Sequence, residues 1–219
     1  VEPKKVIPAV MEFVDIAGLI PGASRGEGLG NRFLSHIREV DALAHIIRVF
    51  EDDNVTHVAN QIDPIADIES IQTELALSDL ETLERAIERA GKKSKTGDKT
   101  PLSVTETYDH ARRLLDQQLK IHPSALTSEQ LCELASLCLL TLKPVVYIVN
   151  TGEENSDGGR YVEQLTNHAD SEGAEIIFVS ARIEEEISHL SAEDRVLFLN
   201  DIGVQESGLD RVIRAGYRL

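Results

Sequence analysis

The chain has 219 residues, of which 42% are hydrophobic and 27% are charged, and its formal net charge is −16. These proportions are typical of a globular protein with a buried core, and no apolar run approaches the roughly 20 residues that a membrane-spanning helix needs. The negative charge argues against a protein whose whole surface binds nucleic acid, because phosphate groups would be repelled, but it allows a local basic contact.

The first residue is Val1 and the single methionine is Met11, so we expect the chain to be part of a longer protein. Cys132 and Cys138 stand six positions apart in an apolar helical stretch, where they would point to different faces. This spacing suits neither a disulfide nor a metal site, and two buried thiols are predicted. Without a disulfide framework or an export signal, the expected compartment is the cytoplasm.

Residues 1–66 are predicted to form the first part of an α/β domain. The expected elements are a strand (6–14), a glycine-rich loop (18–30), a helix (31–39) and a second strand (42–50). The second strand is apolar on both faces, which is typical of a parallel sheet that is covered on both sides.

Residues 67–139 are predicted to form a helical insertion. Apolar residues first repeat at spacings of four and three, in Ala76, Leu80, Leu83, Ile87 and Ala90. After a polar stretch the same spacing returns, in Val104, Tyr108, Ala111 and Leu115. Two such helices with a polar connection predict an antiparallel helical hairpin, which is short for a sustained coiled coil.

Residues 140–219 are predicted to form the second part of the α/β domain. The expected strands are 145–149 and 174–179, and the expected helices are 159–171, 183–190, 192–201 and 208–217. Ser191 and Asp194 resemble a capping box at the start of a helix. The predicted fold class is α/β, with a mostly parallel sheet that is interrupted by the helical hairpin.

Three short motifs each follow a predicted strand, and the first is Asp15-Ile16-Ala17-Gly18. In nucleotide hydrolases an aspartate at this place holds a magnesium ion, and the glycine lets its backbone N–H approach the γ-phosphate. If it stood alone, an ordinary turn from strand to loop would also explain the motif.

The second motif is Asn150-Thr151-Gly152-Glu153 and the third is Ser180-Ala181. GTPases carry Asn-Lys-x-Asp at the second place, where the asparagine braces the loop and the aspartate pairs with guanine. Here Thr151 replaces the lysine and the longer Glu153 replaces the aspartate, so pairing with guanine is not assured. Ser180-Ala181 would supply a backbone contact to the base. Because ligands of open α/β sheets bind at the carboxyl ends of strands, the order of the three motifs predicts a nucleotide-binding site.

Four segments resemble the YchF (Obg-like ATPase) family of P-loop NTPases. FVDIAGLIPGASRGEGLGN (13–31) resembles its switch II, and DIESIQTELALSDLETLERAI (67–87) is similar to the start of its helical insertion. LTLKPVVYIVN (140–150) and GLDRVIRAGYRL (208–219) also match. The resemblance implies a G-domain-like fold, Mg²⁺-dependent hydrolysis of ATP or GTP, and association with the ribosome.

The resemblance also implies two catalytic positions. In this family a hydrophobic residue replaces the glutamine that positions water in Ras-type enzymes, and the matching residue here is Leu19. A histidine after the second strand would take over this task, and it matches His57. An imidazole can act as a base or accept a hydrogen bond near neutral pH.

The sequence departs from the family in one important respect. No Gly-x-x-x-x-Gly-Lys-Ser/Thr motif occurs in the 219 residues. We expect this phosphate-binding loop and the switch I threonine before Val1, and the C-terminal TGS domain after Leu219. On this expectation the 219 residues alone are inactive, and the function belongs to the longer protein.

Basic residues gather at the predicted hairpin tip: Arg89, Lys92, Lys93, Lys95 and Lys99. They are candidates for contact with ribosomal RNA phosphates, although a solvated lysine-rich turn would look the same. No aromatic residue lies among them to stack bases, which argues against sequence-specific recognition of RNA or DNA. Two alternatives to an ATPase stay open: a non-catalytic module that binds the ribosome, RNA or protein, and a GTPase.

Overall fold

The computed structural model describes residues 10–16, 29–50, 62–95, 102–152 and 158–219. At its centre is a parallel sheet with the strand order β1-β2-β3. The strands are β1 (Leu43–Arg48), β2 (Val145–Asn150) and β3 (Glu175–Val179). Each lies within one or two residues of a strand predicted from the apolar runs. All three strands run in the same direction, so their carboxyl ends lie at one edge of the sheet.

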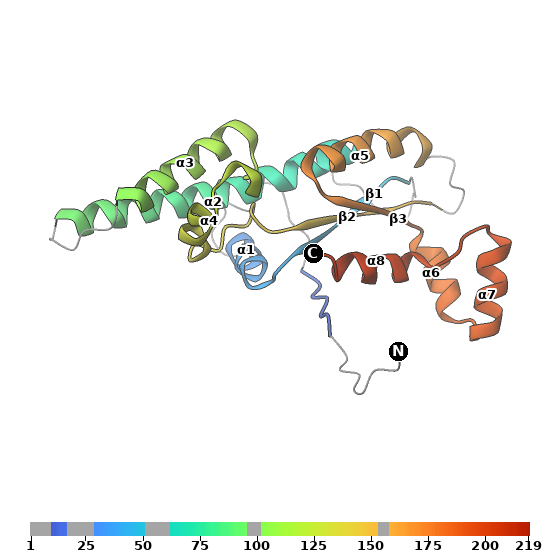
Figure 1. The fold of residues 1–219 in the computed structure, drawn as a ribbon. Coiled ribbons are helices and arrows are strands. Elements are labelled where there is room, and N and C mark those ends of the chain that lie inside the picture. Colours follow the sequence, from blue (N-terminus) through green and yellow to red (C-terminus); the bar gives the residue numbers. More distant parts are fainter. Residues whose placement is uncertain (1–9, 17–28, 51–61, 96–101, 153–157) are drawn as a thin grey trace.

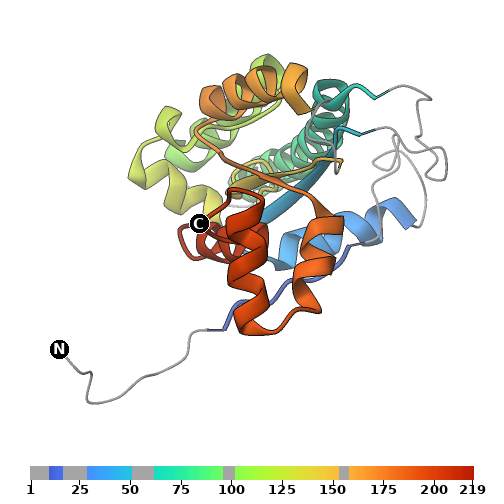
Figure 2. The same cartoon turned by 90° about the vertical axis from the view of Figure 1, so that its right-hand side faces the viewer.

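Helices cover both faces of this sheet (Figure 1). On one face, α5 (Gly158–Glu172) and the first turns of α2 (Pro64–Lys95) pack on the apolar side chains Ile47, Tyr147 and Val149. On the other face, α8 (Gly208–Gly216) packs on Val146, Ile148 and Ile177. Figure 2 shows the same layers from the side, with α5 on one side of the strands and the C-terminal helices on the other.

The long connection between β1 and β2 is helical. In Figure 1, α2 and α3 (Leu102–Gln118) lie side by side and project away from the sheet. A short 3-10 turn (Pro123–Ala125) and α4 (Ser128–Ala135) follow. Part of the predicted apolar seam is fully buried in this pair, because Ala76, Leu83, Ala111 and Leu115 are each 0% exposed. Leu80, Ile87, Val104 and Tyr108 are partly buried.

The remaining helices are α1 (Leu29–Glu39), which precedes β1, and α6 (Ala181–Ser188) and α7 (Ala192–Asp201), which follow β3. Ser191 caps α7 by accepting a hydrogen bond from the backbone N–H of Asp194. The Asp194 carboxylate in turn accepts from the Ser191 hydroxyl, at 2.7 Å, so the predicted pairing of these two residues is present. Within the described ranges, no helix combines the length and the apolar character that crossing a membrane requires.

The predicted strand at 6–14 is wrong in its described part. Residues 10–16 form no regular secondary structure, and Met11 lies against Gly216 at the end of α8. A strand needs a neighbour for its backbone hydrogen bonds, and the described sheet contains β1, β2 and β3 alone. The segment therefore lies beside α8 without joining the sheet.

The prediction of two buried thiols is also wrong, because Cys132 and Cys138 are both exposed. Helix α4 ends at Ala135, so Cys138 lies beyond it, with a positive φ of 47°. The buried positions of this region are occupied by leucines, among them Leu134 at 0% exposure. The short helix α4 and the turn after it bury the leucines of this stretch, fully or in part, and leave both cysteines at the surface.

Candidate functional site

The carboxyl edge of the sheet brings together residues that are far apart in the sequence. Because β1, β2 and β3 are parallel and in register, Arg48 lies opposite Asn150, and Asn150 lies opposite Val179. Backbone N–H and C=O groups that extend past the last strand pairs are open to a ligand at such an edge. Two of the three predicted motifs begin at this point.

The loops after β2 and β3 are tied to each other by hydrogen bonds. The backbone N–H of Ala181 donates to Oδ1 of Asn150 at 3.0 Å. The backbone N–H of Thr151 donates to the carbonyl of Val179 at 2.8 Å, and the Thr151 hydroxyl donates to the same carbonyl at 3.2 Å. Thr151 is buried. The second and third motifs therefore form one structural unit.

Ser180 starts helix α6 as its N-terminal cap, but its hydroxyl makes no capping hydrogen bond. Within the described residues, Oγ of Ser180 is buried and has no hydrogen-bond partner. Buried polar atoms are seldom left in this state, because the lost hydration is not replaced. A ligand or a water molecule at the edge could satisfy this hydroxyl.

The end of β1 adds an aromatic residue to the same edge. Nε of Arg48 donates to the carbonyl of Phe50 at 2.8 Å, and the guanidinium lies 4.8 Å from the centre of the Phe50 ring. A side chain at Gly152 would come within 3.2 Å of Cβ of Phe50, so the glycine allows the loops after β1 and β2 to pack closely. Sequence reasoning missed Arg48 and Phe50 as site residues, although an aromatic residue at the carboxyl end of an apolar strand was a usable signal.

Helix α8 supports the third motif from behind. The Glu184 carboxylate accepts hydrogen bonds from the backbone N–H groups of Gly208, at 2.6 Å, and Leu209, at 3.1 Å. A carboxylate at this place satisfies the free donors of the helix N-terminus and interacts favourably with its dipole. Gly208 also packs so tightly against Val179 that an added Cβ would overlap it. Val179 directly precedes Ser180, so its contact with Gly208 fixes the position of the loop after β3 relative to α8.

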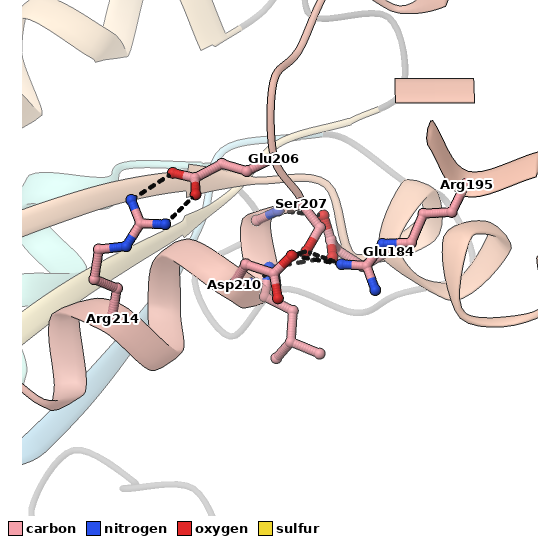
Figure 3. Close-up of polar contacts among 8 residues, drawn as sticks. Glu184, Arg195, Glu206, Ser207, Asp210 and Arg214 are labelled. Carbon is pink, nitrogen blue, oxygen red and sulfur yellow. Dashed lines mark hydrogen bonds and ion pairs between the residues drawn. The ribbon is translucent and has the colours of Figure 1, made fainter. Parts of the chain in front are cut away.

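Figure 3 shows that a second group of charged side chains fixes the start of α8. The Ser207 hydroxyl caps the helix and donates to the Asp210 carboxylate at 2.8 Å. Arg195 of α7 donates to both of these side chains, and Arg214 forms a two-pronged ion pair with Glu206. These contacts tie α7 and the turn before α8 to α8, which itself packs on the sheet.

The described part of the first motif, Asp15 and Ile16, is not joined to this edge. Asp15 is exposed, and within the described residues no hydrogen bond or ion pair connects it to Asn150 or Ser180. Its neighbour Ile16 packs against the cluster that contains Leu34 of α1 and Leu75 of α2. Residues 10–16 make no strand pairing in the described sheet, so the sheet does not fix the position of Asp15.

Several predicted site residues lie outside the described residues: Gly18, Leu19, His57, Glu153 and Lys99. The backbones of Lys93 and Lys95 belong to α2, but their side chains are outside the described part. Arg89 and Lys92 are exposed on α2, and Lys92 forms an ion pair with Glu88 at 3.3 Å. The described residues contain no group of three or more His, Cys, Asp or Glu side chains placed to hold a metal ion.

Two buried polar networks connect the helical pair to the sheet, and sequence reasoning found neither. In the first, the carboxylate of Asp79 accepts hydrogen bonds from the backbone N–H groups of Leu140, at 2.9 Å, and Thr141, at 2.8 Å. The Thr141 hydroxyl donates to it as well, at 2.8 Å. Burial raises the pKa of Asp79 against the opposing effect of these donors.

The second network surrounds Glu172 at the end of α5. Its carboxylate accepts from Lys120, Gln72 and the Tyr147 hydroxyl, the last at 2.9 Å. Burial alone would raise the pKa of Glu172, but Lys120 and the other donors outweigh it and lower the pKa. Burial raises the pKa of Tyr147 and lowers that of the neighbouring His45 to about 4.

Comparison with known proteins gives consistent matches. Residues 3–79 match the family model of the 50S ribosome-binding GTPase. The ribosome-binding ATPase YchF of Haemophilus ducreyi is 48% identical over 219 residues, which is 100% of this chain and 60% of that protein. The protein of the same name from Bacillus subtilis is 45% identical over 222 residues, covering 100% of this chain and 61% of its own length.

The chain thus spans about 60% of the length of the curated relatives that it matches. A solved structure of the Schizosaccharomyces pombe YchF GTPase is 30% identical, with a TM-score of 0.75. The match covers 93% of this chain and 56% of that one.

Proposed function

Because this chain belongs to the YchF family, we propose that its sheet edge binds the base of a nucleoside triphosphate, ATP or GTP, for hydrolysis. The chain has the α/β fold of a P-loop NTPase, with a helical pair between β1 and β2. The observation that supports the proposal most strongly is the hydrogen bond between Ala181 and Asn150. It joins the two motifs that the sequence assigns to the base.

In the proposed site each group has a distinct task. Asn150 braces the loops, and the unpartnered Ser180 hydroxyl and backbone groups near Ala181 are available to the base. Phe50 provides an apolar side chain at the end of β1, next to Gly152. The carboxylate of Glu153 would contact the edge of the base, and its extra methylene changes which base it can reach.

The remaining roles rest on the sequence motifs. Asp15 would hold Mg²⁺, whose preferred ligands are carboxylate and phosphate oxygens, and Gly18 would lie next to the γ-phosphate. The bound ion would neutralise charge on the phosphates. His57 would position or activate the attacking water, because the side chain of Leu19 has no hydrogen-bonding group.

We also propose that the protein associates with the ribosome, as the names of its relatives state for those proteins. Arg89 and Lys92, which are exposed on α2, are proposed contacts. Lys93, Lys95 and Lys99 continue the basic run in the sequence and are proposed contacts as well. Attraction to RNA phosphate requires no particular base sequence. The relatives' association with ribosomes implies that this protein acts in the cytoplasm.

A titration of the intact protein with ATP and with GTP tests the proposed site. We expect at least one nucleotide to bind, and the Glu153→Asp variant to shift the preference toward GTP. Binding of neither nucleotide would favour a non-catalytic module. The His57→Ala variant should bind nucleotide like the wild type but hydrolyse it about 100-fold more slowly. Unchanged turnover in this variant would remove His57 from the mechanism.

A further inference from the structure

A pocket lies away from the sheet edge, between α1, α2 and the turn after α4. Its volume is about 260 Å³, and its lining residues are Arg38, Thr82, Arg85, Ala86, Arg89 and Leu137. Half of these residues are arginines and none is acidic. The chain as a whole has 38 acidic and 22 basic residues, so the pocket is opposite in sign to the average surface.

Arg38 is fixed in this pocket by its own hydrogen bonds. It donates to the hydroxyls of Ser78, at 2.9 Å, and Thr82, at 3.0 Å, and to the carbonyl of Cys138 at 3.3 Å. These acceptors are neutral, and they set the position of the guanidinium before any ligand arrives. A fixed side chain loses little further conformational entropy on binding.

Arg85 and Arg89 stand four residues apart on α2 and therefore project from the same side of the helix. Nε of Arg85 donates to the carbonyl of Glu81, and its guanidinium forms a loose ion pair with the Glu81 carboxylate at 3.7 Å. Arg89 makes no hydrogen bond or ion pair with another described residue. Three positive charges thus share one pocket that has no acidic residue in its lining. Two carboxylates lie near them: Glu81, which pairs loosely with Arg85, and the buried Asp79, whose pKa Arg38 lowers by charge.

We propose that this pocket binds a phosphate group of an RNA backbone, an inference that rests on the proposed association with the ribosome. The planar guanidinium pairs with two phosphate oxygens at once, which makes arginine well suited to phosphate. A bound phosphate would relieve the repulsion among Arg38, Arg85 and Arg89. The lining contains no aromatic side chain to stack a base, so the pocket reads the backbone and not the sequence.

The test is the binding of a fluorescein-labelled 20-nucleotide RNA hairpin of mixed sequence to the intact protein, followed by anisotropy. The Arg85→Gln and Arg89→Gln variants should each bind about fivefold more weakly at low salt. Each should also lower the slope of log affinity against log salt concentration by about 1, as expected for one lost phosphate contact. Both positions are exposed, and glutamine keeps a high helix propensity, so the fold should persist.

The matched control is Arg113→Gln, because Arg113 is an exposed arginine of α3 that does not line the pocket. It removes the same charge and should change the affinity by less than about twofold. Equal losses in all three variants would show an effect of net charge alone and would overturn the pocket. So would a wild-type protein that fails to bind the hairpin at low salt. ATP titration of the same samples tests the sheet edge separately.

Discussion

The backbone N–H of Ala181 donates a 3.0 Å hydrogen bond to the side-chain oxygen of Asn150, 31 residues earlier in the chain. This bond holds the start of α6 next to the end of β2, so the two loops form one structural unit. Through the contact between Gly208 and Val179, α8 also fixes this unit from behind. The loops that we propose to bind the base are therefore supported by packing against α8.

Replacement of Asn150 by alanine should weaken both the fold and the site. The N–H of Ala181 would lose its acceptor, which costs about 1 kcal/mol of unfolding free energy and lowers nucleotide affinity about fivefold. Urea unfolding and nucleotide titration measure the two effects. Asn167→Ala, an exposed asparagine of α5, is the control and should leave both values unchanged. If nucleotide affinity is unchanged in Asn150→Ala, the hydrogen bond between Asn150 and Ala181 is not needed for nucleotide binding.

Two glycine-to-alanine substitutions should have opposite effects. At Gly208 the new Cβ would overlap Val179, so Gly208→Ala should lower the unfolding free energy by about 1–3 kcal/mol and weaken nucleotide binding. At Gly91, inside α2, nothing lies within 4 Å of an added Cβ. There alanine should raise the unfolding free energy by about 1 kcal/mol, because it is the better helix former. A stabilised Gly208→Ala protein would contradict the packing described.

Asp79→Asn should strongly destabilise the protein. The amide offers one accepting oxygen where the carboxylate offers two, so its NH₂ group would face the N–H of Leu140 or Thr141. We expect a loss of about 2–3 kcal/mol in the unfolding free energy, measured by urea denaturation. The exposed Asp116 of α3 provides the control, since Asp116→Asn should change stability by less than about 0.5 kcal/mol.

The stability of the protein should fall in mild acid because of His45. Burial lowers the pKa of this side chain to about 4, whereas in the unfolded chain it is 6.5. Below pH 6.5 His45 of the unfolded chain binds a proton, whereas His45 of the folded chain binds one only below about pH 4. Proton binding therefore favours the unfolded chain between these two values. The loss across this window should reach about 3 kcal/mol.

His45→Phe should remove this part of the pH dependence, because phenylalanine binds no proton but can keep the ring contact with Tyr147. Unfolding free energies from pH 4 to pH 8 provide the measurement. His189→Gln, at the exposed end of α6, should follow the wild-type profile. Parallel profiles for His45→Phe and the wild type would show that another group causes the acid sensitivity.

The spacing of apolar residues was sufficient to predict most of the helices and strands. The order of the motifs predicted the part of the candidate site that contains Asn150 and Ala181. The apolar runs gave the three strands, and the spacing of Ala76, Leu83, Ala111 and Leu115 gave the buried seam of α2 and α3. The order of the motifs placed Asn150 beside Ala181 because parallel strands end at one edge. These predictions depend on periodicity and on sheet geometry, which a single sequence contains.

Features that depend on distant partners could not be predicted. Asp79 looks like an ordinary polar residue of a helix, and the backbone N–H groups that donate to its carboxylate lie 61 and 62 residues away. Gln72 and Glu172 are separated by 100 residues. The exposure of Cys138 depends on where α4 ends, and the placement of Asp15 depends on whether a strand finds a neighbour. Each of these outcomes is decided by tertiary structure.

Helix α2 runs without interruption from Pro64 to Lys95. Ile68 lies in the core beneath the sheet, whereas Lys92 is exposed near the other end, and about 36 Å of helix separates them. A tilt of about 5° at Ile68 would displace the end that carries Lys92 by about 3 Å, by simple leverage over that length. A small tilt of α2 beside the strands is therefore amplified at its basic end, because the helix is continuous between the two points.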